Sequence, residues 1–369
     1  NNLVALRRVA EAEAAYALVL SMDADHVSAR INLANLLAEL DRPAEAETLL
    51  RDGLARFPDE AELHWNLALL LLQGGRMAGA WAEYEWRWGL PGFVRMRRNF
   101  PGPRWNGEAL NGRRLLLHVE QGYGDAIEFC RFVSRIDGPV VLECRPGLER
   151  LFATLAGDVT VVTAGKPLPP CDVELPLMSL PHVLGVQMDD LPGPIPYLRA
   201  PDEALAAIAD LAQGDDLKIG FVWAGSPTRK ANHRRSLTAA DFAPLFKLAG
   251  CRFHSLQVGP ALGEVAAAFG VADLAPRLKD FADTAAAIAA MDLVITVDTA
   301  VAHLAGALGK PVWVLLSKPC DGYLWMLDRA DSPWYPSARL FRQPREGDWA
   351  AVFAEVAEAL VIWRDQGKQ

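Results

Sequence analysis

The pattern of apolar and polar positions between residues 115 and 316 predicts an α/β architecture. Short apolar runs alternate there with amphipathic segments such as 282–291 and 301–308. The predicted strands span residues 115–120, 140–144, 159–163, 173–177, 219–224, 252–258, 293–297 and 312–316. Such alternation gives parallel strands with crossover helices, and a proline-rich stretch at 192–196 followed by a predicted helix at 202–213 divides the two series. We therefore expect two doubly wound lobes, with ligands bound in the cleft at the carboxyl ends of their strands.

The first quarter of the chain has a different, repeating pattern. Small and large apolar positions recur every 34 residues, as at Ala12, Ala46 and Ala80 and at Tyr16, Leu50 and Tyr84. A period of about 34, with a small residue where two helices cross, is typical of the tetratricopeptide repeat (TPR). Residues 3–22 fit the second helix of one repeat, and 27–57 and 61–90 fit two more, with Pro43 opening a helix.

Fewer than three complete repeats need a cap, which we expect from the rest of the chain or from residues preceding it in a longer natural protein. A TPR segment holds a peptide or protein on its concave face, or serves only as a structural cap. A proline-containing stretch, 89–107, with the basic run Arg95, Arg97 and Arg98, is expected to be a domain connection with a solvated face. The predicted domains are residues 1–95 (TPR), 96–213 (first lobe) and 214–369 (second lobe).

Composition excludes several classes of protein. Hydrophobic residues make up 51% of the 369 residues and charged residues 22%, which favours large cores. The net charge of −9 argues against a general nucleic-acid binder. No apolar run is long enough for a membrane span, and no signal peptide is visible. The five cysteines lack metal-ligand spacing and fit the reduced thiols of a cytoplasmic protein.

Three loops at predicted strand ends carry candidate chemistry. The first, Gly122–Phe129 (GYGDAIEF), has Gly122 and Gly124 for a tight turn and places Asp125 at a helix start, where capping is the simplest role. The second, Val222–Arg235, ends a strand at Gly225-Ser226. A cluster of basic or titratable side chains follows, suggesting an anion site or else an exposed loop: Arg229, Lys230, His233, Arg234 and Arg235.

The third loop, Val297–Pro311, leads from an apolar strand through Asp298 and Thr299 into a helix of small residues. Unpaired N–H groups and the positive dipole end at a helix start favour a diphosphate, and Thr299 adds a hydroxyl donor. His303 lies one turn further on the same face. Asp298 would oppose a phosphate if it pointed inward, so we expect it to cap the helix or to hold a sugar hydroxyl.

The order and spacing of five segments resemble bacterial TPR proteins with a heptosyltransferase-like glycosyltransferase domain, and the resemblance covers almost the whole chain. These segments are GYGDAIEF, VWAGSPTRK, SLQVGP, VDTAVAHLAGALGKPVWVLL and DSPWYPSARLFRQ. The resemblance implies an α/β fold with two Rossmann-like lobes of the GT-B type, preceded by an all-α TPR solenoid. It also implies an inverting, metal-independent enzyme with no cofactor, whose acceptor lies on the first lobe and whose nucleotide-sugar donor lies on the second.

Residue roles follow from the same resemblance. Asp125 occupies the position of the general base, beside the acceptor loop of Gly122 and Gly124. The remaining matched positions are expected to contact the donor: Ser226, Arg229, Lys230, Gln257, Asp298, Thr299, Ala300 and His303. Two departures are a Val297 and an Ala300 where relatives carry glycine, and the absence of an Arg beside Trp325.

Three functions compete at this point. The first is transfer of a sugar to a hydroxyl of a protein held by the TPRs. The second is transfer to a glycan or lipopolysaccharide, with the TPRs serving assembly only. The third is a non-catalytic scaffold with a degenerate transferase fold, favoured by the missing Arg and opposed by the intact Asp125 and the Asp298–His303 motif.

Overall fold

The computed structural model describes residues 8–228, 232–320 and 322–366. Backbone contacts divide the chain into two compact units. The helical unit comprises Asn1–Asn99, Pro181–Met188 and Tyr323–Leu327, and the α/β unit comprises Phe100–Leu180, Asp189–Gly322 and Asp328–Gln369. No helix within these described ranges is long and apolar enough to cross a membrane.

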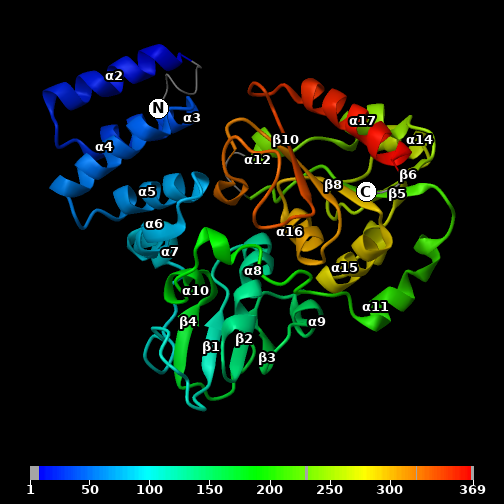
Figure 1. The fold of residues 1–369 in the computed structure, drawn as a ribbon, viewed down its shortest axis with the longest axis horizontal. Coiled ribbons are helices and arrows are strands. Elements are labelled where there is room, and N and C mark those ends of the chain that lie inside the picture. Colours follow the sequence, from blue (N-terminus) through cyan, green and yellow to red (C-terminus); the bar gives the residue numbers. More distant parts are fainter. Residues whose placement is uncertain (1–7, 229–231, 321, 367–369) are drawn as a thin grey trace. The chain divides into compact units, whose positions relative to one another are not determined.

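The helical unit is a stack of short helices joined by tight turns (Figure 1). Its helices are α2 (Val9–Met22), α3 (Val27–Glu39), α4 (Pro43–Arg56), α5 (Ala61–Gln73), α6 (Met77–Tyr84) and α7 (Pro91–Val94). Ala12, Ala46 and Ala80 are all buried, as expected of small residues where helices cross closely. Pro43 is the first residue of α4, where its missing N–H costs nothing. The helices confirm the predicted repeat bounds from residue 22 onward, and the predicted start at residue 3 lies outside the described residues.

Two later segments of the chain pack onto the last helices of this stack. The Trp81 indole N–H donates to the Val186 carbonyl at 3.1 Å, and the Leu327 N–H donates to the Gln73 carbonyl at 3.2 Å. The hydroxyls of Tyr323 and Tyr84 lie 3.3 Å apart. The later chain therefore supplies the cap that an incomplete stack of repeats requires.

The first sheet of the α/β unit is parallel, with strand order β3-β2-β1-β4. Its strands are β1 (Leu115–His118), β2 (Val140–Cys144), β3 (Val159–Thr163) and β4 (Val173–Pro176). Leu115 pairs with Val140 on one side and with Val173 on the other. The helices of this half are α8 (Tyr123–Phe129) and α9 (Glu149–Phe152), whereas α10 (Leu180–Val183) falls mostly in the segment Pro181–Met188 of the helical unit.

The second sheet is also parallel, with strand order β10-β9-β8-β5-β6-β7. Its strands are β5 (Leu217–Val222), β6 (Cys251–Ser255), β7 (Ala272–Asp273), β8 (Leu293–Val297), β9 (Val312–Leu316) and β10 (Ala338–Arg342). Its helices are α11 (Asp202–Ala207), α12 (Asn232–Arg235), α13 (Ala243–Phe246), α14 (Glu264–Ala268), α15 (Phe281–Ala290), α16 (Ala300–Ala307) and α17 (Trp349–Asp365). The chain starts in the middle of the sheet and winds outward to both edges, which is the Rossmann order. The predicted fold class is confirmed.

Several predicted boundaries differ from the observed ones for local reasons. The strand expected to end at residue 224 ends at Val222, because the N–H groups of Trp223 and Ala224 donate to the Gln257 side chain instead of to a neighbouring strand. The helix expected over 202–213 breaks after Ala207 into a short 3-10 turn. The edge strands β7 and β10 were not predicted, because β7 has two residues and β10 carries two arginines among its five residues.

Side chains from both halves of the α/β unit bind each other. The guanidinium of Arg150, in α9, lies 2.9 Å from the carboxylates of Asp280 and Asp283 at the start of α15. The buried Arg131 donates to the Trp334 carbonyl at 2.9 Å. These contacts bring the strand ends of the two sheets, and the loops that follow them, within reach of one another.

Candidate functional site

Topology places the three candidate loops at the points where each sheet reverses its winding direction. The loop before α8 follows β1, which lies between β2 and β4. The loops containing Ser226 and Thr299 follow β5 and β8, the two neighbouring strands from which the second sheet winds outward. Ligands of such sheets bind at these switch points, outside the carboxyl ends of the strands.

Asp125 is the third residue of α8 rather than its N-cap. Gly122 is the N-cap, and the Asp125 carboxylate reaches back to accept the Gly122 N–H at 2.9 Å. The capping role weighed from the sequence is therefore real, although it is exercised from inside the helix. Asp125 is half-buried.

Thr299 is the N-cap of α16, and Ala300 is the first residue of that helix. The Thr299 hydroxyl accepts the Val301 N–H at 3.3 Å and lies 3.1 Å from the Thr296 hydroxyl. The first turn of α16 thus follows directly after buried strand β8, with its N–H groups directed toward the switch point. The helix begins where the sequence predicted, but Thr299 caps it, so the expectation that Asp298 is the cap is wrong.

Arg235 holds Asp298 and resolves the expected conflict between that carboxylate and a phosphate. Its guanidinium donates to the Asp298 carbonyl and lies 3.3 Å from the carboxylate, and both side chains are buried. A Cβ on Gly225 would lie 2.5 Å from this guanidinium, so a larger residue there would displace the Arg235 side chain. A buried arginine balances the charge of Asp298, so an anion beside Thr299 would meet a neutral pair.

The first and third loops touch each other at Gly124. A Cβ built on Gly124 would lie 2.9 Å from Cδ2 of His303, 3.5 Å from its Nε2 and 3.6 Å from the Cα of Ala300. Helix α8 therefore packs directly against the first turns of α16, and glycine is required for the close approach. The predicted base and the predicted diphosphate site lie on adjoining helices.

His303 sits in a buried polar cluster beneath this contact. Its Nδ1 lies 3.1 Å from the Tyr335 hydroxyl and 3.2 Å from the Glu128 carboxyl. Burial raises the pKa of Glu128 well above its usual range; Arg131 opposes the rise, while Asp125 and Asp298 add to it. Burial therefore favours the neutral acid form of Glu128.

Other expected site residues have more structural roles or lie outside the described part of the chain. The carbonyl oxygen of the buried Gln257 side chain accepts N–H groups from Trp223 and Ala224, at 3.2 and 2.9 Å, and so shapes the loop after β5. The exposed Ser226 hydroxyl lies 2.9 Å from that of Thr228. Arg229 and Lys230 fall outside the described residues. A nucleoside contact by Gln257 stays a prediction.

Sequence reasoning did not assign site roles to Glu128, Arg235 or Tyr335. Glu128 had a usable signal, since it lies one helical turn after Asp125 within the first motif. Arg235 was seen only as one member of a basic cluster. In the described part of the chain, no three His, Cys, Asp or Glu side chains gather as a metal site would require.

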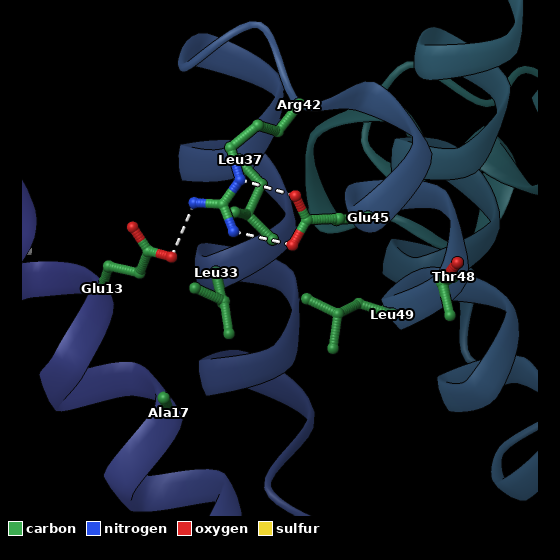
Figure 2. A pocket seen from close by; sticks show the side chains of 8 residues that line it. All are labelled: Glu13, Ala17, Leu33, Leu37, Arg42, Glu45, Thr48 and Leu49. Carbon is green, nitrogen blue, oxygen red and sulfur yellow. Dashed lines mark hydrogen bonds and ion pairs between the residues drawn. The ribbon is translucent and has the colours of Figure 1, made fainter.

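A separate cavity of about 350 Å³ lies among the first helices of the helical unit (Figure 2). Arg42 reaches across it between the carboxylates of Glu13 and Glu45, 2.7 and 2.6 Å away, above an apolar wall that includes Leu33 and Leu37. None of its lining residues was predicted to act in catalysis. The cavity is a feature of the repeats.

Comparisons with known proteins agree with this division of the chain. The tetratricopeptide repeat family matches residues 3–67, and glycosyltransferase family 9 (heptosyltransferase) matches residues 261–318. Protein FlbA of Caulobacter vibrioides is 31% identical over 90% of this chain. The chain spans 60% of the length of FlbA.

A solved structure shares the fold of the α/β unit. The family 9 glycosyl transferase from Veillonella parvula is similar over 68% of this chain and 91% of its own, with a TM-score of 0.51 and 13% identity. The two family matches fall on the two parts of the chain that the motifs distinguished, a TPR segment and a heptosyltransferase-like domain. The solved structure shows a likeness of fold.

Proposed function

We propose that the protein is an inverting, metal-independent glycosyltransferase that moves a sugar from a nucleotide-sugar donor to an acceptor hydroxyl. The observation that carries the proposal is the contact of Gly124 with His303 and Ala300. It sets a carboxylate suited to accept a proton beside a helix start suited to hold a diphosphate.

The proposed reaction is a single displacement. The acceptor oxygen attacks the anomeric carbon as Asp125 takes its proton. The bond from that carbon to the phosphate oxygen breaks on the opposite face, and the nucleoside diphosphate leaves with the electron pair. A base of this kind contributes about 10²- to 10⁴-fold.

Charge that develops on the leaving diphosphate needs stabilisation by fixed dipoles and cations. The Ala300 N–H at the start of α16 and the Thr299 hydroxyl are the proposed donors, and the positive dipole end of the helix adds to them. Lys230 and Arg229, expected from the resemblance to bind the phosphates, would supply positive charge in place of a metal ion.

We infer that the acceptor is a protein or peptide and that the TPR stack binds it. TPR solenoids hold extended partners on one face, and the cavity of Figure 2 offers both apolar and charged contacts. Transfer to a glycan, with the repeats serving assembly only, is the alternative that acceptor screening would reveal.

A cytoplasmic site of action fits the cysteines. All five lie in the described part of the chain and none forms a disulfide there, and burial raises the pKa of Cys130 and Cys144. Unpaired, protonated thiols are ordinary in a reducing compartment.

The test is a panel of nucleotide sugars. One donor should raise the melting temperature and then be consumed, with release of its nucleoside diphosphate, when cell extract or candidate peptides are added. Turnover should persist in excess EDTA. Turnover that EDTA abolishes and Mg²⁺ or Mn²⁺ restores would contradict metal independence, and a donor that is never bound would contradict the function itself.

A further inference from the structure

Glu128 is 1% exposed to solvent and lies one turn of α8 beyond Asp125. Among the described residues, neither of its carboxyl oxygens makes a well-directed hydrogen bond. The nearest polar atom recorded for it is Nδ1 of His303, 3.2 Å from Oε2. An acid this deeply buried, beside a histidine of the donor site, requires a reason beyond packing.

An ion pair with the neighbouring Arg131 does not explain why Glu128 is buried. The Arg131 guanidinium donates to the Glu128 backbone carbonyl, to the carbonyl of Trp334 and to the Tyr197 hydroxyl, at 2.9, 2.9 and 3.1 Å. Its hydrogens are thus directed away from the carboxyl group. Burial, with Asp125 and Asp298 nearby, keeps the pKa of Glu128 high, and a neutral carboxyl has an O–H to donate.

Two groups near Nδ1 of His303 can supply an O–H. The first is the neutral Glu128 carboxyl, 3.2 Å away. The second belongs to Tyr335, at 3.1 Å, and burial raises the pKa of this phenol well above its usual range, so it also stays protonated. A ring nitrogen that accepts from such donors carries no hydrogen, and in neutral imidazole the hydrogen then resides on the other nitrogen. That other nitrogen, Nε2, is on the edge of the ring that faces Gly124.

We propose that Glu128 is a positioning residue: as a buried donor to Nδ1, it holds His303 in the tautomer that presents Nε2–H to the leaving diphosphate. The inference rests on the proposed function for its ligand, whereas the tautomer is a property of the protein alone. Glu128 itself touches no substrate. It acts by fixing the donor that does.

The direct test is nitrogen NMR of the ligand-free protein with labelled histidine. Of the seven histidines, His303 is assigned by the signals that His303→Gln removes. We expect protonated Nε2 and bare Nδ1 in the wild type and in Glu128→Gln, whose amide still donates. We expect a mixture of tautomers in Glu128→Leu, which has no donor.

Pyrophosphate affinity, measured by calorimetry, provides the second readout. Glu128→Leu should bind pyrophosphate about tenfold more weakly, and Glu128→Gln should bind it nearly as well as the wild type. The matched control is Glu174→Gln, which alters a second histidine–glutamate pair, 2.8 Å from His118 in the first sheet. It should change neither the His303 signals nor the affinity.

Three results would overturn the inference. Glu128→Gln could lose as much pyrophosphate affinity as Glu128→Leu, which would make Glu128 a charged partner of His303. The tautomer could be unchanged in Glu128→Leu, which would leave the task to Tyr335. If Glu128→Leu does not fold, the test rests on Glu128→Gln. A change of the His303 tautomer or a loss of pyrophosphate affinity in Glu128→Gln then refutes the proposal. Wild-type protein with protonated Nε2 but no pyrophosphate binding would instead refute the donor site of the proposed function.

Discussion

Replacing Asp125 with Asn separates its two candidate tasks because the change is nearly isosteric. The Asp125 carboxylate accepts the Gly122 N–H at 2.9 Å, and the carbonyl oxygen of an asparagine can accept the same bond. What the amide cannot do is take a proton from an acceptor hydroxyl. Asp125→Asn therefore keeps the cap and removes the base.

The two effects differ in size by enough to be measured. Loss of a negative charge in the first turn of α8 should cost about 0.3–1 kcal/mol of folding stability. Loss of a general base should slow turnover about 100-fold or more, which raises the barrier by about 2.7 kcal/mol. Donor binding should be unchanged, because the proposed diphosphate contacts belong to α16.

The assay compares turnover, donor affinity and melting temperature for wild type and Asp125→Asn, using the donor found in the nucleotide-sugar panel. Asp241→Asn is the matched control. Asp241 also reaches back to a helix start, accepting the Thr238 N–H at 2.7 Å, and it is exposed and belongs to none of the three candidate loops. Both variants should lose similar stability, and only Asp125→Asn should lose activity. An Asp125→Asn enzyme as active as Asp241→Asn would assign Asp125 to the cap alone.

Three further predictions concern packing, pH and donor binding. Gly124→Ala sets a Cβ 2.9 Å from His303. It should lower the unfolding free energy, measured by urea titration, by about 1 kcal/mol net, because overpacking costs about 1–3 kcal/mol and replacing a helical glycine gains about 0.5–1 kcal/mol. The control Gly92→Ala, whose Cβ would meet open space, should show no loss in the same titration. Burial lowers the pKa of His254 to about 4, below the roughly 6.5 of the unfolded chain, so the unfolded state binds a proton first as pH falls and stability is lost between those values. Between pH 7.5 and 5, the unfolding free energy of His254→Leu should therefore fall by about 1–2 kcal/mol less than that of the wild type. An equal fall in both proteins would contradict a buried neutral His254. Thr299→Ala should weaken nucleoside diphosphate binding about tenfold or more by calorimetry and Thr299→Ser should restore it; undiminished affinity in the alanine variant would remove the hydroxyl from the donor site.

The sequence by itself determined the bounds of four strands. Strands β2, β8 and β9 are fully buried and have the predicted bounds, because an apolar run between polar turns has few alternatives in a parallel sheet. The partly buried edge strand β3 also has the predicted bounds. The 34-residue repeat likewise determined the helices, since each small residue must meet a crossing helix. The edge strands β7 and β10 of the second sheet lacked such a signal.

Only the tertiary structure decided how the site residues are partnered. Arg235 and Asp298 are 63 positions apart, and nothing in either local sequence indicates that one neutralises the other. The same holds for Glu128 and His303, which meet because α8 follows one switch point and α16 follows the other. Sequence pattern reports which face of an element is apolar, whereas the charge, tautomer and accessibility of a polar side chain depend on neighbours brought to it by folding.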